Sequence, residues 1–366
     1  MDIVYLSASV IPSTKANSIQ VQKMCKAFTE IGHRVTLFAT SSITDISDKE
    51  HINLPFSYNL SPKIGPAPIS SMIYGLRIGK QASQMKADIW YGRCPHSLFH
   101  VGRHGCPFIY EAHTLPQRSM RKWLENRLFK MQGFRRLVVI SNSLRNAYLD
   151  MFSNLSDQQV MVAHDGAEIP DDIDDIDSYC APKENKSDAP LEIGYVGSLY
   201  PGKGVEGVLD LAKMRPQHSY HIVGGSQKEV SKWATKGLSQ VKFHGRVSQD
   251  SVHKMLRKFD ILLLLPQFQV ETAGGGNIAP YMSPLKMFEY MASGRPIIAS
   301  SLAVIREVLV DHKNALLVSP NKLNEYANAL DQLVLYPHLR FELAKSAYID
   351  LENNYTWQKR GKLVLQ

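Results

Sequence analysis

The sequence has few of the features that mark secreted, disulfide-stabilised or membrane-spanning proteins. It contains only four cysteines in 366 residues and no Cys-x-x-Cys pair, so neither a disulfide framework nor a zinc site is indicated. Its longest apolar runs, such as 261–266, fall far short of the roughly 20 residues that cross a bilayer. No basic region or small-residue cleavage site accompanies the first apolar run, 2–7. These absences predict a cytoplasmic protein with reduced thiols.

Two other patterns are missing. A Gly-x-Gly-x-x-Gly fingerprint does not follow the first expected strand, which argues against a dinucleotide oxidoreductase. No RNA-binding aromatic motif or recognition-helix pattern stands out, although the formal net charge is +8. Such a charge fits nucleic acid, an acidic membrane surface or an anionic substrate, because net charge speaks to partners and not to the fold. The position of the basic residues has to decide.

A repeating order of short apolar runs and amphipathic stretches fills most of the chain. The run 2–7 is followed by helical spacing over 19–31 and by a second apolar run at 34–38. This order recurs to residue 170, and again from 191 to 350. The acidic, aperiodic segment 171–190 between them predicts a linker. The chain therefore predicts an α/β fold of two doubly wound, Rossmann-like domains, 1–170 and 191–350, each with a parallel sheet covered on both faces.

The strongest local signal is the segment Ser283 to Ser300, SPLKMFEYMASGRPIIAS. Pro284 at a helix start, apolar residues on one helix face and Gly294 after the last turn predict a loop, a helix and a strand. A helix amino-terminus binds phosphate through its free N–H groups, and Lys286 adds a positive charge there. An ordinary buried helix with a solvated Glu289 is the alternative interpretation.

This segment resembles the retaining GT-B glycosyltransferases of family 4, or glycosyl transferases group 1, whose two Rossmann-like domains face a cleft. The resemblance implies that Glu289 binds the ribose hydroxyls and that the backbone around Ser283, Pro284 and Leu285 holds the diphosphate. Many members carry a glutamate that faces the donor sugar eight residues earlier, where this chain has Tyr281. The donor sugar is therefore left unassigned. The closing segment 351–366 is similar to the family's last helix, which returns to the first domain.

A glycine-rich turn at 194–204 is similar to the family's turn after the first strand of the second domain. There Gly197 permits close approach of the diphosphate and Lys203 supplies a cation, while Ser198 stands where the family often has arginine. Three neighbouring glycines alone are more typical of a tight turn.

The resemblance also covers the strand at 241–244. Main-chain groups that contact the base would follow it, at Arg246 and Val247. Main-chain recognition leaves no side-chain signature, so uridine and guanosine nucleotides are not separated.

In the first half, the strand end with Glu111 and His113 is similar to the family's Glu-x-His, which implies that His113 lies near the transferred sugar and the donor phosphates. A structural histidine hydrogen-bonded to Glu111 is the alternative. Asn17 and Ser18, in the loop after the first strand, are candidates to meet phosphate or acceptor. We favour helix capping for them.

The segment 118–136 combines basic and aromatic residues with a lone Glu125 and predicts a basic amphipathic helix. Such a helix either lies on an anionic membrane or is a normal domain helix with solvated charges. Family members that act on lipid-linked acceptors commonly have such a surface, so we favour a peripheral contact on the inner face of the cell membrane. Its candidate residues are Arg121, Lys122, Trp123, Arg127 and Lys130.

The main hypothesis is sugar transfer, with retention, from a UDP- or GDP-sugar to an acceptor hydroxyl of a surface polysaccharide or glycolipid. His113, Lys203 and Lys286 are the catalytic candidates, because cations stabilise the charge that develops on a leaving diphosphate. A cation-based phosphate site makes a divalent metal unnecessary, so no cofactor is expected. A nucleotide-sugar epimerase of the same architecture and a basic membrane- or nucleic-acid-binding module are the alternatives, although no acid and base carboxylates can be placed for the epimerase.

Overall fold

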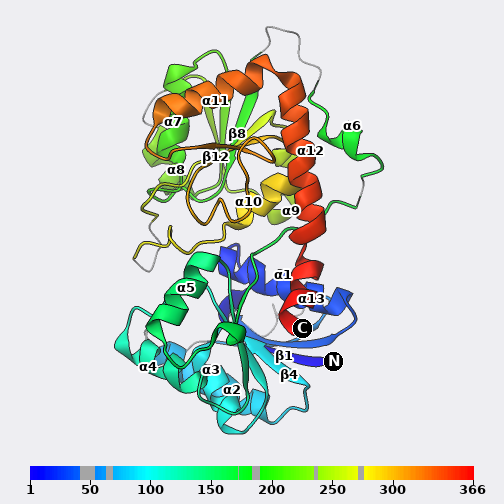
Figure 1. Ribbon diagram of the computed structural model, residues 1–366, viewed down its shortest axis with the longest axis vertical. Coiled ribbons are helices and arrows are strands. Elements are labelled where there is room, and N and C mark those ends of the chain that lie inside the picture. The colour runs from blue at the N-terminus through cyan, green and yellow to red at the C-terminus, as the bar shows by residue number, and fades with distance from the viewer. Residues whose placement is uncertain (42–53, 63–68, 172, 184–189, 235–237, 271–275) are drawn as a thin grey trace. The chain divides into compact units, whose positions relative to one another are not determined.

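The computed structural model describes residues 1–41, 54–62, 69–171, 173–183, 190–234, 238–270 and 276–366 (Figure 1). These residues form two compact units. Unit 1 comprises Met1–His164 and Trp357–Gln366, and unit 2 comprises Asp165–Thr356. Each unit contains one parallel β-sheet, so the predicted α/β class with two separate sheets is confirmed.

Unit 1 has a sheet of seven parallel strands in the order β3-β2-β1-β4-β5-β6-β7. The strands are β1 (Asp2–Ile11), β2 (Arg34–Ser41), β3 (Ser57–Ser61), β4 (Ile89–Gly92), β5 (Phe108–Ala112), β6 (Phe134–Val139) and β7 (Val160–Val162). The helices are α1 (Ala16–Glu30), α2 (Ile69–Ser83), α3 (Pro95–Arg103), α4 (Ser119–Leu128), α5 (Asn142–Met151) and α13 (Trp357–Leu365), with a short 3₁₀ turn, η2 (Asp157–Gln159). The C-terminal helix α13 packs against α1.

Unit 2 has a sheet of six parallel strands in the order β10-β9-β8-β11-β12-β13. The strands are β8 (Glu192–Val196), β9 (Ser219–Val223), β10 (Val241–Gly245), β11 (Ile261–Leu264), β12 (Ile297–Ser300) and β13 (Leu316–Val318). The helices are α6 (Ile176–Cys180), α7 (Val205–Met214), α8 (Gln227–Ala234), α9 (Gln249–Leu256), α10 (Leu285–Ala292), α11 (Leu323–Leu335) and α12 (Pro337–Asn354).

The sheet of unit 2 is buried on both faces. Leu262 and Leu264 of β11 belong to one core cluster, with residues of α9, α10 and α12, whereas Ile261 and Leu263 belong to another, with residues of α7 and α11. Successive side chains of a strand point to opposite faces, so neighbours in an apolar run enter different cores. This arrangement explains why the run at 261–266 is continuously apolar and not alternating.

The segment predicted as a linker, 171–190, contains a short helix, α6, where it is described. Asp175 caps this helix by accepting from the N–H groups of Asp177 and Ser178 at 3.2 and 3.0 Å. Asp177 in turn pairs with Lys345 at 2.6 Å, and α6 packs on α12. A helix of five residues is too short to show a period, so the acidic composition dominated the prediction. Residues 172 and 184–189 of this segment lie outside the described chain.

The predicted helix over 118–136 is wrong in length. α4 ends at Leu128, and Phe134, Arg135 and Arg136 belong to strand β6. Pairing of β6 with β5 and β7 fixes these residues, and such long-range pairing overrides the local helical spacing. At the other end of the chain, α12 runs without interruption to Asn354, past the boundary expected at residue 350.

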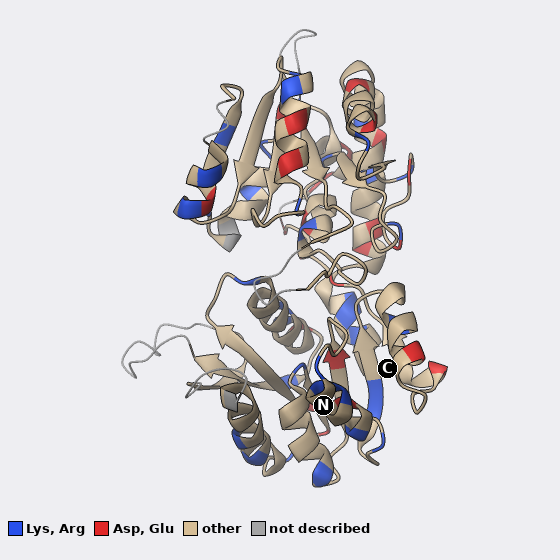
Figure 2. Ribbon diagram, turned by 90° about the vertical axis from the view of Figure 1, so that its left-hand side faces the viewer, with Lys and Arg blue, Asp and Glu red and all other residues tan. Residues whose placement is uncertain are grey.

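Lysine and arginine occur on several helices and strands of both units, as do aspartate and glutamate (Figure 2). The net charge of +8 is therefore not confined to the segment 118–136. No helix within the described residues has the length and apolar character needed to span a bilayer.

Candidate active site

Helix α10 presents an uncapped amino-terminus where the loop after β11 ends. Pro284 is its N-cap residue, and among the described residues no side chain caps the first N–H groups. The first turn also lacks an acidic residue, so the free N–H groups and the helix dipole favour an anion there. Gly294, with a φ of 62°, ends the helix as predicted. Leu285 is only partly buried, and the buried face consists of Met287, Phe288, Tyr290, Met291 and Ala292.

The turn after β8, 197–204, called the phosphate turn because it is predicted to hold the diphosphate, meets Lys286 of α10. The Nζ atom of Lys286 lies 4.1 Å from the ring centroid of Tyr195 and 3.5 Å from the main-chain oxygen of Lys203. The Tyr195 hydroxyl donates to the main-chain oxygens of Ser198 and Lys203, at 2.8 and 3.2 Å. A Cβ atom at Gly197 would lie 3.4 Å from the Lys286 ammonium, so glycine lets the lysine approach the turn. The structure thus brings the two predicted cations together.

Both lysines carry depressed pKa values. Burial, followed by the charge of Lys203, holds the pKa of Lys286 well below its usual range, while Glu289 acts in the opposite direction. Burial also lowers the pKa of Lys203. Two like charges in a partly buried place disfavour each other, and a bound anion would reverse both shifts. The site is therefore built to gain from a group with several negative charges, such as a diphosphate.

The loop before α10 is fixed from within unit 2. The hydroxyl of Ser283 accepts from the backbone N–H of Asp165 at 3.1 Å, and Ser283 itself is buried. Glu289 lies one turn into the helix and is partly buried. The Ser283 side chain therefore serves to hold the loop, while the backbone at the helix start stays the predicted phosphate contact.

The carboxyl ends of β8, β9 and β10 lie side by side through main-chain hydrogen bonds. Gly197 N–H donates to the oxygen of Val223 at 2.9 Å, and Gly224 N–H donates to the oxygen of Gly245 at 2.7 Å. Arg246, exposed, and Val247, partly buried, follow directly. The predicted base-contacting backbone thus lies on the same sheet edge as the phosphate turn, where open α/β sheets bind ligands.

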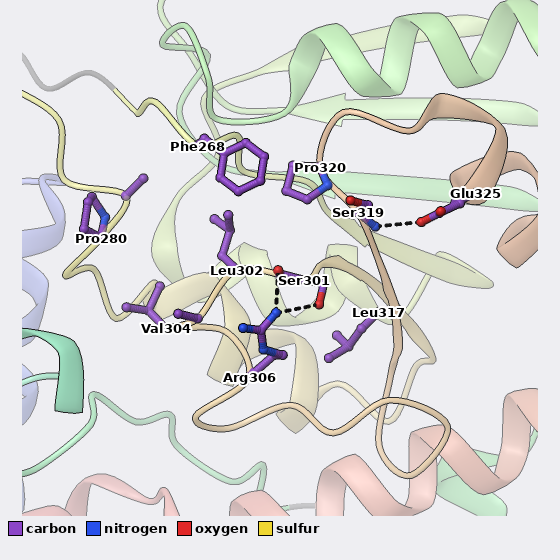
Figure 3. Close-up of a pocket in the computed structure, with 12 residues that line it drawn as sticks. Phe268, Pro280, Ser301, Leu302, Val304, Arg306, Leu317, Ser319, Pro320 and Glu325 are labelled. Atoms are coloured by element: carbon purple, nitrogen blue, oxygen red, sulfur yellow. Dashed lines mark hydrogen bonds between the residues drawn. The ribbon is translucent and has the colours of Figure 1, made fainter.

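A separate pocket opens at the carboxyl ends of β12 and β13 (Figure 3). It has a volume of about 620 Å³ and is lined by residues of the loops after β11, β12 and β13. Motif reasoning missed this pocket, because no recognisable pattern connects the three loops.

In unit 1, Glu111 on β5 lies at the centre of a buried polar cluster. Its Oε1 atom accepts from Gln20 at 2.7 Å and from Arg360 of α13 at 3.0 Å, and Tyr91 donates to its Oε2 atom. The side chain has no exposed surface, and Arg360 and the adjoining His113 hold the pKa of its carboxyl well below its usual range against the effect of burial. The carboxylate is thus fully engaged inside unit 1, and direct contact with a ligand stays a prediction.

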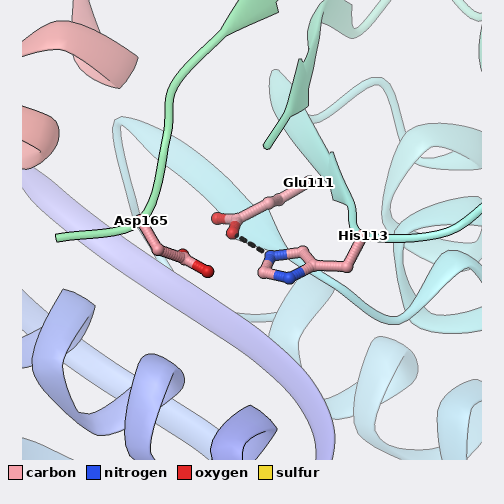
Figure 4. Close-up of side chains that lie close together, drawn as sticks. All are labelled: Glu111, His113 and Asp165. Carbon is pink, nitrogen blue, oxygen red and sulfur yellow. Dashed lines mark hydrogen bonds and ion pairs between the residues drawn. The ribbon is translucent and has the colours of Figure 1, made fainter. Parts of the chain in front are cut away.

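His113 extends from the end of the same strand toward Glu111 (Figure 4). Its Nε2 atom lies 2.6 Å from Glu111 Oε1, and its side chain is 17% exposed. Burial, with the charge of Arg93, lowers its pKa to about 4 even though Glu111 acts in the opposite direction. At neutral pH His113 is therefore a neutral imidazole with Nε2–H donated to Glu111. Its Nδ1 atom is left as an acceptor.

The predicted capping of α1 by Asn17 or Ser18 is wrong. The helix begins at Ala16 with Lys15 as its N-cap, so both residues lie within the first turn. Ser18 donates to the main-chain oxygen of Val10 at 2.6 Å and is fully buried, whereas Asn17 donates to the Ser9 hydroxyl at 3.0 Å. Both side chains tie the helix start back to β1.

The five residues predicted to contact a membrane lie in two environments. Four of them belong to α4, and Lys130 follows the helix. Arg121 pairs with the buried Glu125 at 2.7 Å and also contacts Tyr110, so it neutralises a charge inside unit 1. Trp123 is 51% exposed, and the guanidinium of Arg127 lies 5.6 Å from its ring centroid. The remaining predicted residues, Lys122 and Lys130, are also exposed.

Three residues of these clusters had no signal in the sequence. Tyr195 and Tyr290 read as core aromatics of a strand and a helix, yet the hydroxyl of Tyr290 accepts from the N–H of Val196 at 2.8 Å and so supports the start of the phosphate turn. Arg360 is separated from Glu111 by 249 residues, and only the packing of α13 reveals the pair.

Comparison with known families gives two matches that share the chain between them. The model for Glycosyltransferase Family 4 matches residues 18–169, and the model for Glycosyl transferases group 1 matches residues 181–350. The uncharacterized glycosyltransferase MJ1069 of Methanocaldococcus jannaschii is 26% identical over 72% of the chain, and a second one from that organism, MJ1178, is 26% identical over 45%. The matches span 66% and 44% of those relatives, so the chain covers less than two thirds of either.

Solved structures share the fold over nearly the whole chain. HepE of Anabaena, crystallised with UDP, has a TM-score of 0.72 at 16% identity and is covered over 98% of its length by 100% of this chain. A glycosyltransferase of Rickettsia africae has a TM-score of 0.74 at 14% identity, with 100% of this chain and 97% of that chain covered. Sucrose-phosphate synthase of Thermosynechococcus elongatus gives 0.74 at 16% identity, with the same coverage. With its family 4 first half, its group 1 second half and two Rossmann-like sheets, the chain belongs to the GT-B glycosyltransferases.

Proposed function

We propose that this glycosyltransferase moves a sugar from a UDP- or GDP-sugar to an acceptor hydroxyl, with retention of the anomeric configuration, in the synthesis of a surface polysaccharide or glycolipid. The observation that carries the proposal is the meeting of Lys203, Lys286 and the uncapped start of α10 on one sheet edge. HepE of Anabaena, which has the same fold, was crystallised with UDP and with UDP-glucose, which supports a uridine nucleotide as the first donor to test.

In this reaction the bond between the anomeric carbon and the diphosphate oxygen breaks, the acceptor oxygen bonds to that carbon, and the acceptor's hydroxyl proton passes to the leaving diphosphate, on which negative charge develops. Lys203 and Lys286 stabilise this charge by electrostatic attraction, and the N–H groups at the start of α10 add hydrogen bonds. A bound diphosphate raises the pKa values of the two lysines, which are lowered in the free protein, and so favours their charged forms. Since these cations supply the positive charge, we propose that transfer needs no divalent metal.

The neutral His113 fits a supporting role at the sugar. Its Nδ1 atom can accept a hydrogen bond from a sugar hydroxyl while Nε2–H stays on Glu111. The low pKa, about 4, makes it a poor general acid at neutral pH. We therefore propose that His113 orients the donor sugar and does not transfer a proton to the leaving group.

Product analysis tests the proposal. The protein is incubated with UDP-glucose or GDP-mannose and a mixture of oligosaccharide and lipid-linked acceptors, with and without EDTA. The expected result is UDP or GDP release that resists EDTA, with an α-linked product in the proton NMR spectrum from an α-linked donor. A β-linked product would contradict retention, and complete loss of activity in EDTA that added magnesium restores would contradict a metal-free site.

We also propose that unit 1 touches an anionic membrane through α4. Met120 and Trp123 are 65% and 51% exposed, Arg127 lies by the Trp123 ring, and the exposed Lys122 and Lys130 lie on α4 and just after it. An exposed aromatic residue among basic residues combines apolar insertion with attraction to anionic lipids. Co-sedimentation with phosphatidylglycerol vesicles at low salt should fall for Trp123→Ala. Tyr336→Ala, which removes an exposed ring from unit 2, is the control and should sediment like the parent protein. Equal sedimentation of both variants and the parent would contradict this contact.

A further inference from the structure

The pocket at the carboxyl ends of β12 and β13, called here the β12–β13 pocket, is not part of the predicted phosphate or base contacts. Its volume of about 620 Å³ falls in the range of small-molecule sites, roughly 300–1,000 Å³. The walls combine an aromatic ring, two prolines, small side chains and two charged groups. The lining residues are Phe268, Ala279, Pro280, Ser301, Leu302, Ala303, Val304, Arg306, Leu317, Ser319, Pro320 and Glu325.

The polar wall is held in place by the loops themselves. The Nη1 atom of Arg306 donates to the main-chain oxygen and the hydroxyl of Ser301, at 3.1 and 3.2 Å (Figure 3). Glu325 accepts from the N–H of Ser319 at 3.0 Å and pairs with Lys322 at 2.8 Å. Both bonds of Arg306 within the described chain use Nη1, which leaves the donors on Nε and Nη2 for a ligand.

The apolar wall presents an aromatic ring to solvent on a rigid stretch of backbone. Phe268 is 55% exposed, whereas its main-chain oxygen accepts from the side-chain amide of Asn277 at 2.9 Å. The oxygen of the same amide accepts from the N–H of Val270 at 2.9 Å. The asparagine thus holds the backbone from the carbonyl of Phe268 to the N–H of Val270. Together with Pro280, Leu302 and Val304 of the same lining, the ring gives the pocket a partly apolar wall.

The loop that carries Phe268 also touches the phosphate turn. Gln267 N–H donates to the main-chain oxygen of Gly202 at 2.9 Å. A Cβ atom at Gly202 would lie only 1.9 Å from the main-chain oxygen of Gln269, so the two backbones are in contact on both sides of the ring. On the other wall, Pro280 lies on the loop that leads to Ser283 and α10. The β12–β13 pocket and the phosphate turn are therefore neighbours within unit 2.

From this arrangement we propose that the β12–β13 pocket is a glycan subsite, which binds a neutral sugar residue of the acceptor chain next to the one that receives the transferred sugar. A pyranose ring has an apolar C–H face, which fits Phe268 and Pro280, and hydroxyl groups, which fit Arg306 and Glu325. This inference rests on the proposed sugar transfer. It adds that unit 2, the proposed donor-binding unit, also binds part of the acceptor.

Saturation-transfer NMR provides the test. The full chain, saturated with UDP, is mixed with maltotriose, chitotriose, galactobiose and mannobiose. At least one of these oligosaccharides should bind, and Phe268→Ala should weaken its binding by about tenfold, as expected for removal of a central aromatic contact. Arg306→Gln should also weaken it, whereas Tyr336→Ala, which removes an aromatic ring 58% exposed elsewhere on unit 2, should leave it unchanged.

A second variant guards against loss of the loop structure. Ala303 is exposed and lines the pocket, so Ala303→Tyr should fill it and abolish oligosaccharide binding while the UDP affinity is kept. No binding by the parent protein, or equal binding by the parent, Phe268→Ala and Ala303→Tyr, would overturn the subsite. Failure of the proposed function looks different, because the parent would then fail to bind UDP at all.

Discussion

The buried ion pair between Arg360 and Glu111 should make a measurable contribution to the free energy of unfolding of unit 1. Arg360 is 3% exposed, and its guanidinium donates to Glu111 Oε1 at 3.0 Å and to the main-chain oxygens of His164 and Ala163 at 2.9 and 3.3 Å. Arg360→Met keeps most of the volume but leaves the Glu111 carboxylate buried without its cation. Loss of one partner of a buried ion pair costs about 3–5 kcal/mol.

For a unit of this size each kcal/mol lowers Tm by about 2–4 °C, so Arg360→Met should lower the Tm of unit 1 by about 6–20 °C. Thermal and urea unfolding near neutral pH measure the effect, and Lys362→Met, an exposed change on the same helix, is the control. The double variant Glu111→Gln with Arg360→Met should regain part of the loss, because it removes the unpaired charge. A loss below about 1 kcal/mol, or a double variant less stable than Arg360→Met alone, would refute the reasoning.

Three further predictions concern charge and backbone. The pKa of His113 is lowered to about 4 in the folded chain, so the unfolded chain binds more protons between about pH 6.5 and 4. The free energy of unfolding should therefore fall by about 3 kcal/mol as pH falls through this window. His113→Gln should flatten that pH dependence in urea titrations, and an unchanged slope would be contrary evidence. Because burial and Lys203 depress the pKa of Lys286, diphosphate binding should take up protons. Calorimetry in buffers of different ionisation enthalpy should show this uptake, and Lys286→Met should reduce it. Proton uptake that Lys286→Met leaves unchanged would speak against the role of Lys286. Gly202→Ala places a Cβ atom 1.9 Å from a main-chain oxygen, at a φ of 77°. This change should weaken UDP binding at least tenfold in a calorimetric titration. Unchanged affinity would show that the turn can relax.

The sequence predicts best those elements whose ends are marked by nearby residues such as proline and glycine, or whose burial shows as an apolar run. Pro284 directly precedes α10 and Gly294 follows its C-cap residue, Ser293, while the apolar run 261–266 contains buried β11. These features depend on capping and on burial of a strand, which neighbouring residues report directly. The α/β class and the two separate sheets follow from their repetition.

The missed features depend on partners far away in the chain. The basic and aromatic spacing of 118–136 continues past Leu128, but pairing with β5 turns Phe134 into a strand residue. Tyr195 looks like a core residue of a strand, and only the fold reveals that its ring lies under Lys286. A single sequence carries no signal for such pairs, because the residues are brought together by the sheet order.

The proposed binding of a diphosphate by Lys203, Lys286 and the start of α10 can be tested by calorimetric titration with UDP and uridine. A charge-assisted contact contributes about 1.5–3 kcal/mol, so the parent protein should bind UDP at least about tenfold more tightly than uridine. Lys286→Met should remove most of that preference, whereas Lys213→Met, an exposed change on α7, should keep it. Equal affinity of the parent for UDP and uridine, or a full preference in Lys286→Met, would contradict the account.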